Sequence, residues 1–593
     1  MKLIVPHTGE LHAKDARLIR LAEFLGIRCE VLRLAKELQQ FADSIEEAIP
    51  DRNACLVINP QVIREWVGLN VWPAGMISRL VLRFPSVLVH AVTPDPFVGS
   101  LVAAVSGDAL LSVLPTADAG QSYEISSDAK DICGPFAGLS FGPINAANDH
   151  TLAISTDDMS VRKLICIDGQ PNMVAVRRDK TEILFLASED TADVNAEIGR
   201  EPIHNYFSRL LPHAMALRHI FGEECWQPGE PQASIIIDDP LLRRDYGYLN
   251  FESLLRASEQ HNFHTTISFI PHNYKRNSAR IIRMFRENPH RLSICFHGND
   301  HTQAEFASND TTLLNSRLSI AEERMKAHGQ VTGLHCDKVM VFPQDDYSVE
   351  ALRVLKSRNF RAAISSPYPI DKSVPLTIGD LAQPAVFRYT GFPVFTRSFI
   401  KHTSREDIAF NIFFGKPILI GEHHDTFQHP ASLFELVGEI NSIAPEISWS
   451  NLESVVDNSS LKRRRPDGIV QVRPYSSHVR IANDSRSTER YSIKWRQSGQ
   501  NSPIEYVLQD GTRSPRVTVE DAGIGVSAEL PAGASQTFSI VYRNDHTALG
   551  KPGVMWDARA YLRRRLCEVR DNYLSKNQQM LTAAKALQRR FLQ

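Results

Sequence analysis

Cysteine is scarce in this chain and its positions are scattered. Only eight cysteines occur in 593 residues, and no two of them form a CxxC pair. Disulfide-stabilised secreted domains and cysteine-based zinc sites need several cysteines at close spacing, so neither class fits. The pattern instead predicts reduced and mostly buried thiols.

Long apolar runs and an excess of one charge are missing as well. No run of about 18 apolar residues is present, and the longest candidate, at 100–114, is broken by Gly107 and Asp108. The N-terminal residues lack the basic region, apolar stretch and small-residue cleavage site of a secretory signal. We therefore expect a cytoplasmic protein with no transmembrane segment. The formal net charge of −2 also argues against nucleic acid as a partner.

The first part of the chain, 1–225, reads as an α/β domain without a dinucleotide motif. Short apolar runs alternate with helical patterns up to about residue 130, which favours a parallel α/β unit. The glycines do not form GxGxxG, so a scaffold or regulatory role is favoured for this domain. Between 131 and 200 the runs shorten, which predicts a small antiparallel insertion or extension. Pro228 and Gly229, after a helical pattern at 203–222, indicate the domain boundary.

A second series of strand and helix patterns occupies 226–460. Six apolar runs end in polar residues, and helical patterns separate several of them. Parallel strands buried on both faces give such runs, and barrels keep their chemistry at the carboxyl ends of the strands. We therefore predict a distorted (β/α) barrel for this region.

The C-terminal part changes to alternating patterns and then to one long helix. Alternation with turn residues over 461–548 predicts a small β-sandwich, and the arginine run at 463–465 reads as a solvated linker. The last segment, 549–593, predicts a helix with apolar residues in two rows. One row repeats every seven positions, and Lys576 and Arg590 interrupt the other. We expect this helix to pack on its own domain, and pairing with a second chain in a homo-oligomer is the alternative. The rows contain Leu566, Tyr573, Met580 and Leu587, and Leu562, Val569 and Ala583.

Two aspartates end the first apolar run of the 226–460 region. Asp238 and Asp239 follow "SIII" directly. Neighbouring side chains at a strand end point to opposite sides, so the two carboxylates need not share a role. One could ligate a metal ion while the other accepts a proton from water. A helix-capping or turn role is the alternative, because Asp before Pro often starts a turn.

Two histidines four residues apart follow a later apolar run. His297 and His301 stand in "FHGNDH". Two imidazoles and one carboxylate hold a divalent ion and leave positions open for water and substrate, as a catalytic metal site requires. A polar surface loop is the alternative for this stretch alone.

A third polar cluster ends the last apolar run of the region. His423, His424 and Asp425 follow "LIGE". A histidine here could protonate a leaving amine or alkoxide. Glu422 or Asp425 could instead orient a structural histidine. Three such clusters on successive strand ends favour a shared site.

At these positions the chain resembles the polysaccharide deacetylases, the NodB-like carbohydrate esterases, over about 225 residues. That family has a distorted (β/α) barrel and an apolar strand that ends in two aspartates. The resemblance makes Asp238 the general base and Asp239 a metal ligand. The family motif His-(Ser/Thr)-x-x-His matches "HGNDH", with His297 and His301 as ligands. Gly298 replaces the hydroxyl residue.

The later motifs of the family match less fully. "VMVFPQDDY" keeps Phe342 and Pro343 but lacks the arginine that braces the base. Arg388 and Arg397 are candidates to supply it. The final Leu-x-His motif matches "LIGEHH" loosely, so either of His423 and His424 could be the acid. The order His424-Asp425 is the more usual in the family.

The resemblance implies a metal-dependent hydrolase that removes an acyl group from an N- or O-acylated sugar or polysaccharide precursor. Zinc suits the three ligands, and iron, cobalt or nickel could use them too. Water activated by the ion and deprotonated by Asp238 would attack the acyl carbonyl, with a backbone N–H near Pro343 assisting. A non-catalytic carbohydrate-binding or scaffold protein on the same fold is the alternative. Hydrolysis of a small C–N substrate is a third reading.

Overall fold

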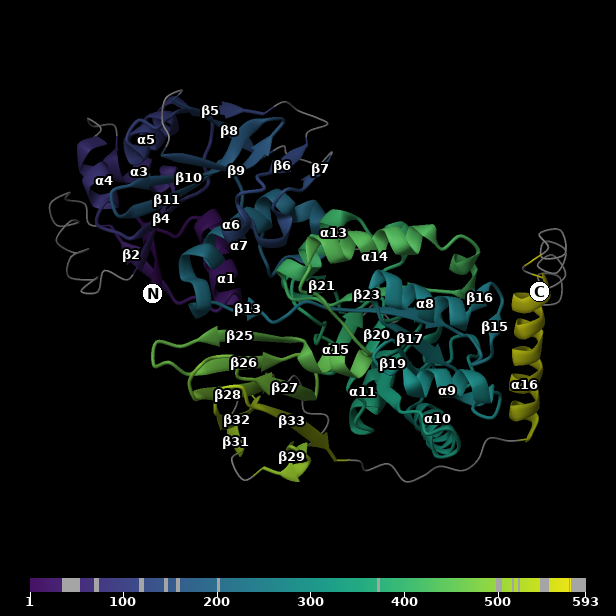
Figure 1. Cartoon of the computed structure of the whole chain (residues 1–593). Helices are drawn as coiled ribbons and strands as arrows, with labels where there is room; N and C mark the ends of the chain where they lie inside the picture. The colour runs from purple at the N-terminus through teal and green to yellow at the C-terminus, as the bar shows by residue number, and fades with distance from the viewer. Residues whose placement is uncertain are drawn as a thin grey trace.

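The computed structural model describes residues 1–34, 54–68, 74–116, 122–142, 148–155, 160–199, 203–370, 374–496, 504–514, 517–520, 523–543, 554–574 and 576. Figure 1 shows an N-terminal sheet with its helices, a central sheet surrounded by helices, two smaller sheets later in the chain, and helix α16 beside the central region. The domain boundaries expected at 225/226 and 460/461 stay predictions. The one expected at 548/549 lies outside the described residues.

The N-terminal sheet has nine strands in the order β2-β1-β3-β4-β11-β10-β9-β6-β7. The pairs from β2 to β11 are parallel, and the pairs from β11 to β7 are antiparallel. The antiparallel strands therefore extend the first sheet. The strands are β1 (Lys2–His7), β2 (Cys29–Arg33), β3 (Ala54–Ile58), β4 (Ser86–Val89), β6 (Tyr123–Ile125), β7 (Ser140–Phe141), β9 (Val161–Ile167), β10 (Gln170–Arg178) and β11 (Thr181–Leu186).

Helices cover both faces of this sheet, so its inner strands, such as β3 and β4, are buried on both sides. Successive residues of β4 belong to different cores, with Leu88 in one and Val87 and Val89 in the other. This alternation is the period of two that a pleated strand imposes. The first core includes side chains of α1 (Ala13–Phe24) and α7 (Phe207–Phe221), and the second includes those of α3 (Pro60–Val67), α4 (Ala74–Val81) and α5 (Pro96–Ser106).

The central sheet is parallel, in the order β22-β20-β19-β18-β17-β14-β23, and β24 (Ser448–Trp449) also pairs with β14. Every residue of β14 is buried, as expected for a strand covered on both faces. The strands of this path are β14 (Gln232–Asp238), β17 (Thr265–Phe269), β18 (Leu292–Phe296), β19 (Cys336–Val341), β20 (Ala362–Ser365), β22 (Val394–Thr396) and β23 (Ile418–Glu422).

The barrel expected for this region is not closed. Strands β22 and β23 end the path, and no ladder joins them within the described residues. A single bridge from Ser398 to Ile420 links the segment after β22 to β23. Strand β22 has only three residues, which is too short for a full ladder and explains why its pattern was not recognised.

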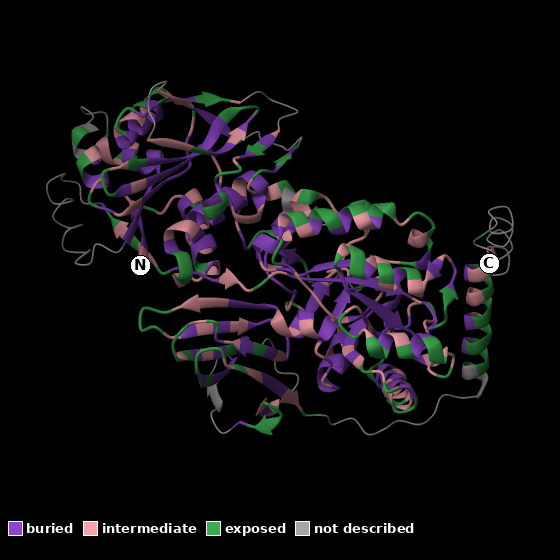
Figure 2. Cartoon of the chain, viewed as in Figure 1, coloured by how far each residue is buried: buried purple, intermediate pink, exposed green. Residues whose placement is uncertain are grey.

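Helices pack around the central sheet and place its loops (Figure 2). The 22-residue helix α10 follows the His297–His301 loop and was not predicted from the sequence; its N-cap Asp310 accepts hydrogen bonds from the backbone N–H groups of Thr312 and Leu313. The main helices are α8 (Phe251–His261), α9 (Ala279–Glu287), α10 (Thr311–Thr332), α11 (Val349–Ser357), α13 (Arg405–Phe413), α14 (Ala431–Ile443) and α15 (Leu452–Asn458).

Two further sheets share one hydrophobic cluster, and the β-sandwich expected over 461–548 stays a prediction. The arginine run expected to be a linker lies largely in a strand instead. Strand β25 pairs with β26 on one side and with β13 on the other. The sheet orders are β13-β25-β26-β28-β32-β31 and β27-β33-β29-β30. The strands are β13 (Gln227–Pro228), β25 (Ser460–Arg464), β26 (Val470–Pro474), β27 (His478–Ala482), β28 (Glu489–Arg496), β29 (Ile504–Gln509), β30 (Thr512–Arg513), β31 (Val517–Glu520), β32 (Gly523–Leu530) and β33 (Ser535–Tyr542).

The C-terminal helix α16 (Val554–Val569) and the turn η8 (Arg570–Leu574) lie with their apolar rows outward. The expectation that these rows pack on the chain's own domain is wrong for the described residues: the side chains of Leu562, Leu566 and Tyr573 are 61–71% exposed. The polar side of the helix packs inward instead, where it forms hydrogen bonds and ion pairs with loops of the central region. The other members of the rows, Met580, Ala583, Leu587 and Arg590, lie outside the described residues. No described helix is long and apolar enough to cross a membrane.

Candidate active site

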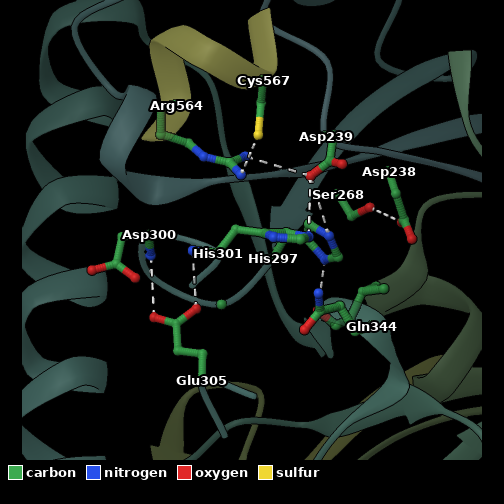
Figure 3. A network of polar contacts seen from close by, with 12 residues as sticks. Asp238, Asp239, Ser268, His297, Asp300, His301, Glu305, Gln344, Arg564 and Cys567 are labelled. Atoms are coloured by element: carbon green, nitrogen blue, oxygen red, sulfur yellow. Dashed lines mark hydrogen bonds and ion pairs between the residues drawn. The ribbon is translucent and has the colours of Figure 1, made fainter. Parts of the chain in front are cut away.

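The two aspartates lie where β14 ends and the chain turns. Asp238 is the last residue of β14, and Asp239 has a positive φ of 80°. This left-handed conformation is uncommon outside glycine, and aspartate is among the residues that tolerate it. The turn sends the two carboxylates to different neighbours, as the strand geometry predicts. Figure 3 shows Asp239 toward the two histidines and Asp238 toward Ser268.

Asp238 is buried and held by two donors. Its Oδ2 accepts a hydrogen bond from Arg397 Nη1 at 2.8 Å, and its Oδ1 accepts one from the Ser268 hydroxyl. Arg397 also contacts Asp345, with Nε 3.2 Å from Oδ1. Burial alone would raise the pKa of Asp238, but the adjacent Arg397 charge holds that pKa below its ordinary value, with smaller contributions from His297 and His423. The carboxylate is therefore ionised and oriented.

Arg397 thus supplies the arginine that the third motif lacks. It lies just beyond β22, and its side chain is 2% exposed. Arg388, the other candidate, lies 3.4 Å from Asp380 and is about one-third exposed. The sequence named both arginines, and the structure selects Arg397.

Asp239, His297 and His301 form a group that fits a divalent ion. Asp239 Oδ1 lies 3.7 Å from His297 Nε2 and 3.3 Å from His301 Nε2, and one donor atom from each residue falls within 4.8 Å of the others. The buried Oδ1 has no hydrogen-bond partner among the described residues. A buried oxygen without a donor, facing two imidazole nitrogens, is the arrangement that a metal ion satisfies.

The protonation of the ligands also suits a metal. His297 Nδ1 lies 2.9 Å from the Val341 carbonyl oxygen, which places the proton on Nδ1 and leaves Nε2 as the lone-pair donor. Burial lowers the pKa of His301 to about 4, so its imidazole is neutral near pH 7. Although burial opposes it, the charges of the two histidines lower the pKa of Asp239 to about 2, with a further contribution from Arg564. Metal ions bind these deprotonated forms.

The loop between the two histidines is built around a buried carboxylate. Glu305 accepts hydrogen bonds from the backbone N–H groups of Asn299, Asp300 and His301. Gly298 has a φ of 66°, and a Cβ there would lie 2.5 Å from Glu305 Oε2. Glycine therefore stands at the hydroxyl position of the family motif because this loop has no room for a side chain.

The two adjacent histidines after β23 have different surroundings. His424 is buried, its Nε2 lies 3.6 Å from Asp571 Oδ1, and its ring packs against Tyr246. His423 is exposed, and its charge contributes to lowering the pKa of both Asp238 and Asp239. His423 therefore lies within electrostatic range of the two aspartates, whereas His424 is held by Tyr246 and Asp571.

Helix α16 brings to the site a residue that no sequence pattern indicates. Arg564 Nη1 lies 3.8 Å from Asp239 Oδ1, and Nη2 lies 3.5 Å from Cys567 Sγ (Figure 3). No local motif marks Arg564, since it is one of three consecutive arginines on a helical pattern. Only the inward-facing polar side of α16 distinguishes it.

A second group of possible metal ligands, His335, Asp337 and Glu453, differs from the first. Both oxygens of Asp337 accept hydrogen bonds, from Asn451 and from the Leu452 N–H at the start of α15. The Glu453 carboxylate accepts a backbone hydrogen bond from Lys338 and contacts an arginine. These contacts explain the group as a helix cap and ion-pair cluster.

No protein-family model matches the chain, and no curated protein matches it. Among solved structures it is similar to the carbohydrate deacetylase Agd3, at 9% identity over 91% of this chain and 98% of that one, with a TM-score of 0.48. A putative polysaccharide deacetylase from Mycobacterium smegmatis has 14% identity over 40% of this chain and 94% of its own, with a TM-score of 0.28. A family 4 carbohydrate esterase from Streptomyces lividans, solved with acetate, has 13% identity over 38% and 94%, with a TM-score of 0.23. The chain resembles deacetylases of known structure, the family that its motifs also resemble.

Proposed function

We propose that this protein is a metal-dependent deacylase that removes an acyl group from an N- or O-acylated sugar or polysaccharide precursor. One observation carries the proposal. Two carboxylates that are neighbours in sequence have separate partners: Asp239 faces two imidazole nitrogens, while Asp238 is held by Arg397. Metal-assisted hydrolysis needs these two functions, a ligand set and an ionised base, side by side.

A divalent ion, for which zinc is well suited, would be held by Asp239, His297 and His301, and it would polarise the acyl oxygen and lower the pKa of water. Asp238 accepts the proton of the attacking water. Its low pKa keeps it deprotonated, and the contacts with Arg397 and Ser268 fix the direction of its oxygens. A backbone N–H beside Pro343 assists at the acyl oxygen.

His423 is the proposed acid that protonates the leaving amine or alkoxide. It follows β23 and is exposed to incoming substrate, and its charge acts on both aspartates. The motif leaves either histidine open as the acid, although the order His424-Asp425 is the more usual in the family. The contacts of His424 with Tyr246 and Asp571 give it a structural role in anchoring η8.

The alternative, a non-catalytic carbohydrate-binding or scaffold protein, rested mainly on the missing third-motif arginine. Arg397 fills that role from another strand end, so the alternative loses its main support.

The test combines metal content with turnover. Elemental analysis of the purified protein should give about one equivalent of zinc or another transition metal, and the His297→Ala, His301→Ala double variant should give none. Asp238→Asn should keep the metal and lose acetate release from a panel of N- and O-acetylated oligosaccharides by at least about 10²-fold.

Asp425→Asn is the matched control, because this carboxylate is exposed and follows β23, the strand that pairs with β14. It should keep near-normal turnover. The proposal would be overturned if the wild-type protein did not bind added metal, or if Asp238→Asn kept full activity.

A further inference from the structure

Arg564 is a buried cation next to the ligand group. Its side chain is 6% exposed, and its Nη1 lies 3.8 Å from Asp239 Oδ1, the oxygen that also faces both histidines. Its Nε is buried and has no hydrogen-bond partner among the described residues. A guanidinium has five N–H donors, and the Nε–H of Arg564 is one that remains available to a bound ligand.

The position of Arg564 follows from specific packing of α16 on the loops around the site. Near its start, Trp556 Nε1 donates to Asp300 Oδ2 at 2.7 Å, on the loop that carries the two ligand histidines. Near its end, Glu568 pairs with Arg276 and lies 3.2 Å from Arg243.

The turn η8 adds two more anchors beyond the end of α16. Tyr246 donates to Asp571 Oδ2 at 2.8 Å, and Asn572 Oδ1 accepts the Gly247 N–H at 2.8 Å. Contacts at both ends of the helix fix the inward direction of Arg564 between them.

The charges at the site leave room for one more anion. Without a metal ion, the carboxylate that faces Arg564 is Asp239. With a divalent ion, the charges of the ion, Arg397 and Arg564 would exceed by one those of the carboxylates that they contact, Asp238, Asp239 and Asp345. A guanidinium and a divalent ion held by Asp239 would repel each other, which favours an additional anion beside both. The group that meets this need in a deacylation is the oxygen of the acyl group itself.

We propose that Arg564 binds the acyl oxygen. Arg564 and the metal-ligand group of Asp239, His297 and His301 together form a site for a singly charged oxyanion. The inference rests on the proposed function and deepens it. As the water oxygen bonds to the acyl carbon, the C=O electron pair moves onto the acyl oxygen, which accepts a hydrogen bond from Arg564. When that pair returns, the C–N or C–O bond breaks, and the leaving group departs with its electrons and a proton. The released carboxylate keeps the same partner.

The experiment uses the full chain loaded with zinc and acetate as the probe. Acetate binding is measured by line broadening of ¹³C-labelled acetate, and kcat, KM and zinc affinity are measured on the same samples. The variants are Arg564→Gln, which removes the charge, and Arg564→Lys, which keeps it. Arg559→Gln is the matched control, an exposed arginine on the same helix.

We expect Arg564→Gln to weaken acetate binding at least tenfold and to lower kcat by about 10²-fold, with KM changed less than threefold, as for the loss of one oxyanion donor. Zinc affinity should stay equal or increase, because a neighbouring cation is removed. Arg564→Lys should recover part of the acetate affinity. Arg559→Gln should match the wild type in all four measurements.

Unchanged acetate binding in Arg564→Gln would overturn the inference. A rise in turnover of this variant would also overturn it, because α16 would then block access to the site. Loss of zinc from the variant would show that Arg564 has a structural role and would overturn the inference as well. Failure of the proposed function is separable. Zinc-loaded protein that binds acetate through Arg564 but releases none from any sugar would refute the deacylase and keep the oxyanion site.

Discussion

The contact between Arg397 and Asp238 allows a quantitative test of how the carboxylate of Asp238, the proposed base, is kept ionised. Arg397→Met retains the apolar stem of the side chain and removes the guanidinium. Both partners are nearly inaccessible, with side-chain exposures of 2% and 3%. Removing one partner of a buried ion pair leaves the other charge uncompensated, which costs about 3–5 kcal/mol of unfolding free energy. Asp238 would keep only the Ser268 hydroxyl as a donor.

The pH dependence should reverse in this variant. In the wild type the pKa of Asp238 lies below its ordinary value of 3.8. Its contribution to stability is therefore present above pH 3.8 and is lost as the pH falls through the lower folded pKa. Without Arg397, burial dominates and the folded pKa rises above 3.8. The variant then loses stability as the pH rises through that value, and the acid limb of its kcat/KM profile moves to higher pH.

The assay pairs denaturant unfolding at several pH values with a pH profile of acetate release. Arg388→Met is the control, since this arginine is about one-third exposed and pairs with Asp380 at 3.4 Å. We expect it to change the unfolding free energy by less than about 1 kcal/mol and to leave the pH profile in place. Equal effects of the two variants, or an unmoved acid limb in Arg397→Met, would refute the reasoning.

Further predictions concern the metal loop, α16 and the ligands. Gly298→Ala should weaken zinc binding by about 10–100-fold, because the added Cβ would collide with the Glu305 carboxylate. Gly169→Ala is the control, since this glycine also has a positive φ but has open space around it, and zinc titrations of this variant should match the wild type. Equal losses of zinc affinity in the two variants would contradict the packing argument. Leu566→Gln should alter the unfolding free energy by less than about 0.5 kcal/mol, whereas Ala560→Gln on the buried face should destabilise or release α16. Limited proteolysis and denaturant unfolding measure both effects. A larger loss of stability in Leu566→Gln than in Ala560→Gln would contradict the orientation of the helix. His301→Ala should abolish the rise in melting temperature that added zinc gives the wild type.

The carboxyl ends of the central strands could be predicted from the sequence because their signal is local. A parallel strand buried on both faces, such as β14, reads as a continuous apolar run, and the first polar residues after it mark the strand end. Strand ends of one parallel sheet lie on the same edge, so polar residues there converge. For this reason the strand-end pattern groups His297 and His301 with one of the two aspartates, and the family resemblance points to Asp239. The structure brings these three residues together.

The residues that complete the site could not be found in this way. Arg397 contacts Asp238 across 159 residues of chain, after a strand of only three residues. Arg564 reaches Asp239 from a helix that follows the whole β-rich region. Its heptad pattern predicted an apolar inward face, but ion pairs and hydrogen bonds to the loops turn the polar face inward. Such tertiary pairing leaves no mark on local periodicity.

The two doublets of this site show how one residue of register decides a role. Asp238 and Asp239 are chemically identical, yet Asp238 accepts hydrogen bonds from an arginine and a hydroxyl group, while Asp239 faces two imidazoles. His423 and His424 also differ, since His423 is exposed and His424 is buried in the contacts that anchor η8. At a strand end, successive side chains point to opposite sides. Chemical identity therefore does not decide the role of either member of a doublet; the neighbours that its position at the strand end provides decide it.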